Sequence, residues 1–131
     1  MENSTSELIN LQEALERLDN DMDLYMILVD AFLQDTVFQA DRMRELEKDF
    51  RNSPSGECLE AAQYIHRVKG AARQLGANHL ATEAQKLEDI FRGKEKGHLH
   101  DGVDGVDTTV LVEEVLELHV KTIEELKRLS N

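Results

Sequence analysis

The chain has 131 residues, which is enough for one domain with one hydrophobic core. Its 27 acidic residues outnumber its 15 basic ones and give a formal net charge of −12. Nucleic acid and anionic membranes, which bind clustered positive charge, are therefore not the expected partners. The longest aliphatic run, Met26 to Val29, is far too short to cross a bilayer, and the first residues lack the basic and apolar regions of a signal peptide. We expect a small, acidic, soluble domain in the cytoplasm.

Apolar residues spaced three and four positions apart predict helices along most of the chain. The first helix is expected to be short, and its apolar stripe consists of Leu8, Leu11, Leu15 and Leu18. A long second helix is expected from about residue 21 to about residue 50. The stripe expected to face the core on this helix is Leu24, Leu28, Ala31 or Phe32, Gln39, Met43, Leu46 and Phe50. Its other side carries a second apolar strip, which consists of Met26, Leu33 and Val37.

The third helix is expected over about residues 54–75, with Ser53 as its N-cap and Pro54 at the first helical position. It should end at Gly76, the usual residue for a left-handed C-cap. A fourth helix follows up to Phe91, then a loop over about residues 93–107 and a last helix from about Thr108 to Leu129. Together these elements predict an all-α protein, an antiparallel four-helix bundle with an additional short N-terminal helix.

One face of the third expected helix carries the residues most suited to chemistry. His66 lies roughly 140° from the centre of the apolar stripe, so its imidazole should face solvent. The residues expected on the same side, one or two turns away, are Ala62, Gln63, Lys69, Gly70 and Arg73. A glycine inside a helix costs about 1 kcal/mol relative to alanine, so Gly70 indicates a need for clearance.

A ring nitrogen that can attack, cations that can hold phosphoryl oxygens and a bare stretch of backbone together favour a phosphoryl acceptor. A histidine near cations is also common on an ordinary solvated helix face. From these residues alone, the two interpretations are equally good.

Residues 66–77 read His-Arg-Val-Lys-Gly-Ala-Ala-Arg-Gln-Leu-Gly-Ala. This segment resembles the signature of histidine-containing phosphotransfer (HPt) domains, which is histidine, any residue, apolar, lysine, glycine, two small residues and then Gly-Ala or Gly-Leu after the helix. Leu80 and Leu87-Glu88 downstream also fall where that family has them, as do residues 28–33 and 11–18 upstream. The resemblance covers essentially the whole chain, so residues 1–131 are expected to form a single HPt domain.

The resemblance implies a phosphoryl carrier with no enzyme activity of its own. His66 would accept a phosphoryl group from the aspartate of one receiver domain and pass it to another receiver, and Lys69 would stabilise the phosphate. Gln63 is a candidate for ordering the phosphoryl group, and the helical wheel adds Arg73. The residues expected where the receiver approaches are Gly70, Ala62, Leu33 and Val37.

The implied partners are response-regulator receiver domains and a sensor histidine kinase, which could be a hybrid kinase, in a two-component pathway. No cofactor is expected on the chain itself, since the receiver brings Mg²⁺, and we expect a monomer. The alternative is a helical adaptor that binds a receiver or kinase domain without phosphotransfer. The presence of both His66 and Lys69 argues against it, because an adaptor could lose either residue. A free-standing protein and a domain of a hybrid kinase both fit.

Three other features are His98 with His100, His119 and Cys58. His98 and His100 lie in the expected loop near Asp101, Asp104 and Asp107, but these carboxylates recur every third residue, unlike those of an EF-hand. We interpret this segment as a solvated loop with no native metal site. His119 is expected to be a packed, hydrogen-bonded core residue. Cys58 is expected to behave as a small buried apolar group.

Overall fold

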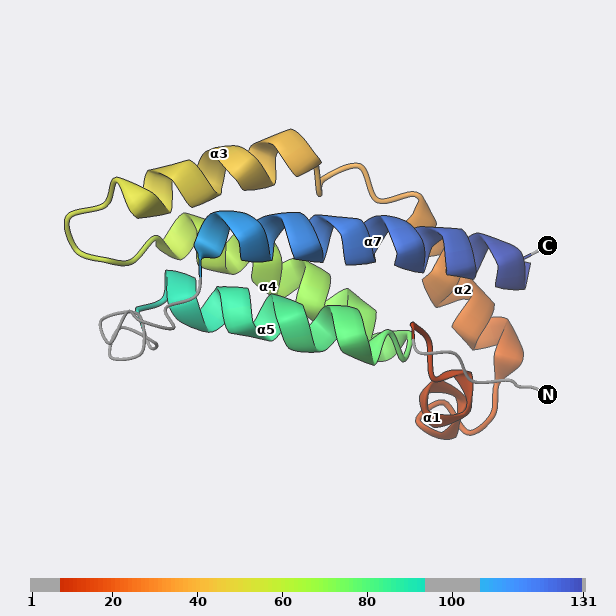
Figure 1. Ribbon diagram of the computed structural model, residues 1–131. Coiled ribbons are helices and arrows are strands. Elements are labelled where there is room, and N and C mark those ends of the chain that lie inside the picture. The colour runs from red at the N-terminus through yellow and green to blue at the C-terminus, as the bar shows by residue number, and fades with distance from the viewer. Residues whose placement is uncertain (1–7, 94–106, 131) are drawn as a thin grey trace.

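A computed structural model describes residues 8–93 and 107–130 (Figure 1). The regular elements in these two ranges are six helices with no strand: α1 (Leu11–Glu16), α2 (Met22–Leu33), α3 (Ala40–Arg51), α4 (Leu59–Gln74), α5 (Asn78–Phe91) and α7 (Thr108–Ser130). The all-α prediction and the short N-terminal helix are confirmed. No helix in the described part of the chain is long and apolar enough to cross a membrane.

The core lies between α4, α5 and α7, which run side by side, with α3 over one end of this group and α2 over the other (Figure 1). The most extensive contact is between α4 and α5, which are antiparallel and joined by a short turn. Among the largest fully buried side chains are Tyr25, Met43, Ile65, Leu87, Phe91 and Leu126. Tyr25 donates a hydrogen bond from its hydroxyl to the carbonyl oxygen of Leu75 at 2.7 Å, so its polar end is satisfied inside the core.

The expectation of one long helix over residues 21–50 is wrong, because the chain forms two helices there, α2 and α3. The Asp35 carboxylate accepts a hydrogen bond from the backbone N–H of Val37 at 2.8 Å and so forms a turn that competes with helix. The Tyr64 hydroxyl, from α4, accepts from the N–H of Gln39 at 2.6 Å and donates to the carbonyl of Val37 at 2.8 Å. The break is thus stabilised by a residue that is distant in the sequence.

The face of α2 that meets the core is also not the expected one. Leu24, predicted to be in the core stripe, is 39% exposed, and Ala31 is exposed as well. The residues of α2 that are buried are Tyr25, Val29 and Phe32. All residues of this helix except Asp23 and Asp30 are apolar or aromatic, so the pattern alone could not decide which face α7 would cover.

The start of α4 differs from the prediction, and its end agrees with it. The helix begins at Leu59, with Cys58 as a partly buried N-cap, so Ser53 and Pro54 precede the helix and do not cap it. The backbone N–H of Cys58 donates to the carbonyl of Phe91 at 2.7 Å, which fixes this end of α4 to the end of α5. After α4, Gly76 has a φ of +77°, and a Cβ there would collide with the carbonyl oxygen of Asn10.

His119 packs as predicted, with its ring centroid 5.5 Å from that of Phe32 and 4.7 Å from that of Phe38. Burial lowers the pKa of His119, although the charge of Asp35 acts in the opposite direction. The hydrogen bond expected for this imidazole is not found within the described ranges. The residues 94–106 of the expected loop, with His98 and His100, lie outside those ranges.

Candidate functional site

The site lies on α4, whose two sides differ sharply in exposure. Ile65, Val68 and Ala72 are buried in the core, as predicted. The side chain of His66 is 58% exposed, which confirms that the imidazole faces solvent. The helix backbone therefore presents the ring from a rigid support that is anchored on its other side.

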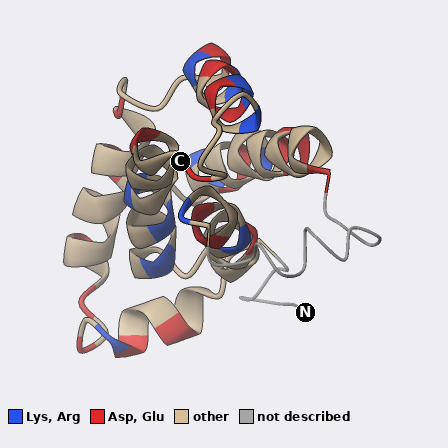
Figure 2. Cartoon of the chain, turned by 90° about the vertical axis from the view of Figure 1, so that its left-hand side faces the viewer, with Lys and Arg blue, Asp and Glu red and all other residues tan. Residues whose placement is uncertain are grey.

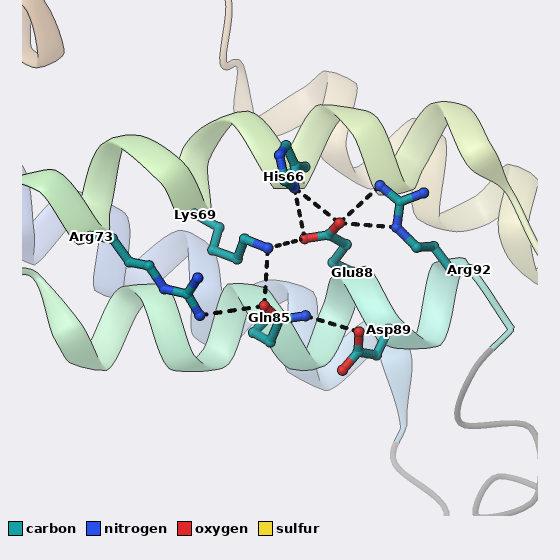
Figure 3. Close-up of polar contacts among 7 residues, drawn as sticks. All are labelled: His66, Lys69, Arg73, Gln85, Glu88, Asp89 and Arg92. Carbon is teal, nitrogen blue, oxygen red and sulfur yellow. Dashed lines mark hydrogen bonds and ion pairs between the residues drawn. The ribbon is translucent and has the colours of Figure 1, made fainter.

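The ring of His66 is held from below by Glu88 of α5 (Figure 3). The two carboxylate oxygens of Glu88 lie 3.1 and 3.0 Å from Nδ1 of the imidazole. Glu88 is buried, with a side chain only 6% exposed. Because an ionised carboxylate can only accept hydrogen bonds, Nδ1 carries the proton, and in the neutral ring Nε2 keeps its lone pair.

Two cations also bind the Glu88 carboxylate. The Nζ of Lys69 lies 2.7 Å from one oxygen, and Nε and Nη2 of Arg92 lie 2.9 and 2.8 Å from the other. Burial by itself raises the pKa of Glu88, but the hydrogen bonds from Lys69, Arg92 and His66 outweigh this effect and lower the pKa from 4.5 to about 2. At neutral pH, Glu88 is therefore ionised and remains an acceptor for Nδ1.

Lys69 does not lie on the solvent-facing side where the sequence placed it. It is buried, with 8% of its surface exposed, and its chain runs into the seam between α4 and α5. There its ammonium donates to Glu88 and, at 3.0 Å, to Oε1 of Gln85 (Figure 3). A buried ammonium requires such partners, because its desolvation would otherwise be too costly.

The other residues expected around His66 divide into exposed and buried ones. Gly70 is exposed, and a Cβ built on it would meet nothing within 4 Å. Gln63 and Arg73 are exposed as well. Ala62 is fully buried, so the expectation that it lines the receiver approach is wrong. Both α3 and α5 pack on α4, which makes the buried arc wider than the apolar stripe suggests.

The two expected docking residues near the end of α2 also differ in their exposure to solvent. Val37 is 53% exposed, whereas Leu33 is partly buried against the core. Further apolar side chains are exposed on the side of α2 opposite Leu33, where Leu24 is 39% and Ile27 is 64% exposed. Beside these side chains, a groove of about 170 Å³ separates α2 from α4. The residues that line this groove are Leu28, Ala31, Phe32, Asp35, Arg67, Ala71, Gln74 and Leu75.

The charge pattern of α4 is unusual in so acidic a chain. Figure 2 shows Lys and Arg alternating with Asp and Glu along α3, the uppermost helix. By contrast, residues 61–77 contain no Asp or Glu, and their charged side chains are those of Arg67, Lys69 and Arg73. The exposed charged side chains of α4 near His66 are therefore the basic Arg67 and Arg73, of which Arg67 forms an ion pair with Asp35 at 3.3 Å, while Lys69 is buried.

Sequence reasoning missed the roles of Gln85, Glu88 and Arg92. A signal was present, because Glu88 lies four residues after Ala84 and three before Phe91, and these spacings place it on the apolar face of α5. Gln85 and Arg92 lie three residues before and four residues after it, on the same side of the helix. A polar strip beside a core stripe indicates a buried network, although it does not say which residue of the neighbouring helix completes it.

No group of three or more His, Cys, Asp or Glu side chains that could hold a metal ion occurs within residues 8–93 and 107–130.

The constellation formed by His66, Glu88 and Lys69 combines an exposed nucleophilic nitrogen, a buried anion and a buried cation.

Comparison with protein families gave a match to the Hpt domain over residues 27–129. This range runs from within α2 to the last turn of α7 and includes every residue of the constellation. Searches of curated proteins and of solved structures found no match.

Proposed function

Since the chain belongs to the Hpt domain family, whose members carry phosphoryl groups in phosphorelays and are not enzymes, we propose that His66 is its phosphoacceptor. In this proposal, His66 receives the group from the aspartate of one receiver domain and passes it to the aspartate of another. The observation that carries the proposal is the contact of Nδ1 with Glu88. It leaves Nε2 of a solvent-exposed, rigidly mounted ring as the nitrogen that can attack.

The bonds that form and break in the transfer step involve this nitrogen and the aspartyl phosphate of the partner. The Nε2 lone pair attacks the phosphorus of an aspartyl phosphate, the N–P bond forms, the P–O bond breaks and the carboxylate of the aspartate leaves. The proton stays on Nδ1, so the phosphorylated ring is cationic, and the Glu88 carboxylate stabilises it. Transfer to the next receiver reverses these bond changes. Mg²⁺ and the remaining catalytic groups belong to the receiver.

Lys69 is proposed to stabilise the phosphate. Its ammonium has three N–H donors, of which Glu88 and Gln85 accept two, so one is available to a phosphoryl oxygen. Gln63 and Arg73, exposed one turn before and two turns after His66, are proposed to order the phosphoryl group. Lys69, Gln63 and Arg73 need no bound cofactor, because they act on the negative charge of the phosphoryl group that the receiver delivers.

The proposed receiver surface combines the basic face of α4 with the exposed apolar face of α2. Gly70 leaves open space beside His66, which lets a partner's backbone come close. Leu24 and Ile27 supply exposed apolar area next to the groove between the two helices, and Val37 extends it beyond the end of α2. Positive charge on α4 suits the acidic active site of a receiver and should speed its association. Partners of this type, a response regulator and the receiver of a hybrid sensor kinase, act in the cytoplasm, and we propose that the chain meets them there as a monomer.

The test is a phosphotransfer screen. The protein is incubated with phosphorylated receiver domains from its host, and the label is mapped by mass spectrometry at neutral pH. We expect acid-labile, base-stable label on His66 and complete loss of label in His66→Gln, with a cooperative melting transition that shows the variant is folded. Label that persists in His66→Gln would refute the assignment. Receiver binding without any transfer to the wild-type chain would instead support the adaptor function.

A further inference from the structure

A chain of hydrogen bonds leads from the outer edge of α5 to the buried ammonium of Lys69 (Figure 3). The Asp89 carboxylate accepts from Nε2 of Gln85 at 2.9 Å. Oε1 of the same Gln85 amide accepts from Nζ of Lys69 at 3.0 Å and from Nη2 of Arg73 at 3.4 Å. Lys69 in turn donates to Glu88, which holds the imidazole, so the side chains of Gln85, Lys69 and Glu88 connect Asp89 to His66.

The donors and acceptors around Gln85 permit only one orientation of its amide. Lys69 and Arg73 can only donate hydrogen bonds, and an ionised Asp89 can only accept them. The amide oxygen therefore faces the two cations, and the amide nitrogen faces the carboxylate. The reversed amide would place N–H groups against an ammonium and an oxygen against a carboxylate. Asp89 thus helps to hold the amide in the orientation that presents its oxygen to Lys69.

We propose that Gln85, oriented by Asp89, is a positioning residue that fixes the ammonium of Lys69 beside the phosphoacceptor. Glu88 alone gives this flexible side chain one anchor, about which the ammonium can swing. The second acceptor on a neighbouring turn of α5 fixes its direction, and this determines where the remaining N–H donor points. The effect on phosphoryl chemistry rests on the function proposed above, whereas the effect on Lys69 itself does not.

The first measurement is made on the unphosphorylated protein. A buried, hydrogen-bonded ammonium exchanges its protons slowly, so Lys69 should give its own ¹⁵N-detected Nζ signal, assigned by its absence in Lys69→Met. We expect this signal to be broadened or lost in Gln85→Leu and in Asp89→Leu. It should return in the double variant Gln85→Glu/Asp89→Asn, which reverses donor and acceptor within the pair but keeps an oxygen facing Lys69. Lys86→Leu, an exposed change at the next position of α5, is the control and should leave the signal intact.

The second measurement follows the phosphoryl group. Phosphoramidate transfers its phosphoryl group to an imidazole nitrogen with loss of ammonia, so His66 can be phosphorylated without a receiver. Hydrolysis of the phosphorylated His66 can then be followed through the ¹⁵N signals of its ring. We expect Gln85→Leu to change the lifetime of the phosphorylated ring by about threefold to tenfold. The same variant should slow single-turnover transfer to a receiver by a similar factor. The double variant should recover most of the change, and Lys86→Leu should show none.

The outcomes separate the two proposals. An unchanged Lys69 signal in Gln85→Leu would overturn the positioning role. A lost signal with unchanged lifetime and transfer would also overturn it, because Gln85 would then support only the packing. If the wild-type chain takes no label from any phosphorylated receiver, the proposed function fails, and the Nζ signal and the lifetime after phosphoramidate still decide the role of Gln85.

Discussion

Two buried glutamates, Glu47 on α3 and Glu88 on α5, are 3% and 5% exposed and yet do different things. Glu47 accepts hydrogen bonds from Arg51 of its own helix at 2.8 Å and from the Thr108 hydroxyl at 2.7 Å, so it fastens the start of α7 to α3. Glu88 binds groups from α4, among them the exposed imidazole of His66. Burial of an acid is therefore not what marks a functional site. What distinguishes the two is whether a partner of the carboxylate reaches solvent with a nucleophilic atom.

The largest difference between the two glutamates should appear when each is neutralised. Glu88→Gln leaves Lys69 and Arg92 without a buried anion, which should lower the free energy of unfolding by about 3 kcal/mol. It should also slow single-turnover transfer by about 10- to 100-fold, because the phosphorylated, cationic imidazole loses the negative charge that stabilises it. Glu47→Gln still accepts a hydrogen bond from Thr108 and should cost about 1 kcal/mol of stability.

Denaturant unfolding and transfer kinetics on both variants check this contrast, with Glu47→Gln as the control for neutralising a buried glutamate away from His66. A transfer rate that falls equally in the two variants would mean that lost stability, and not the contact with His66, slows the reaction.

The pH dependence of stability sharpens the same comparison. The folded pKa of Glu88 is about 2, below its ordinary 4.5. A lowered carboxylate pKa stabilises the fold above about pH 4.5, and this contribution, up to about 3 kcal/mol, is lost as the pH falls toward 2. The difference in unfolding free energy between wild type and Glu88→Gln should therefore shrink over this range. A difference that stays constant from pH 5 to pH 2 would show that the charge of Glu88 does not carry its stabilising effect.

A change at Lys69 tests how much the ammonium that pairs with Glu88 contributes to phosphotransfer. Lys69→Ala should slow transfer by an amount equivalent to about 1–3 kcal/mol of transition-state stabilisation. Because Lys69 is buried and paired, the variant should also lose about 1–2 kcal/mol of stability, whereas an exposed lysine would lose almost none. Thermal unfolding and single-turnover rates separate these effects. Lys69→Met, which keeps the apolar stem, serves as the packing control.

The smallest expected effect on stability is at Gly70. Gly70→Ala should stabilise α4 by up to about 1 kcal/mol, since the added methyl meets nothing within 4 Å. Gly70→Gln should keep a stability close to that of the wild type. It should nevertheless reduce receiver binding and transfer, because its side chain would occupy the space that a partner needs. Melting temperatures and transfer rates for both variants test this. Wild-type transfer by Gly70→Gln would remove the case for clearance.

The sequence predicted the elements that depend on local pattern. The helices, the solvent-facing His66 and the left-handed Gly76 all follow from spacing within one segment. The break between α2 and α3 was missed because Tyr64, far along the chain, stabilises it. The prediction of which face of α2 meets the core was wrong, because nearly every position on that helix is apolar.

The site was predicted only in part, for a related reason. The nucleophile lies on one helix and could be found on one helical wheel. Glu88 and Gln85 complete the site from α5, and their contacts with α4 depend on the register between the two helices. No pattern within a single helix contains that register. The burial of Lys69 and Ala62 follows from the same packing and was missed with it.

The bond between His66 and Glu88 makes the imidazole a reporter of how the two helices sit against each other. An α-helix rises about 5.4 Å per turn, so a slide of α4 past α5 by one turn would stretch the 3.0 Å contact at Nδ1 far beyond hydrogen-bonding distance. The ring would then be free to exchange tautomers, and its two nitrogens would become similar in an NMR spectrum. Core substitutions far from the surface can thus be ranked by the ¹⁵N shifts of one solvent-exposed ring, without a partner and without phosphate.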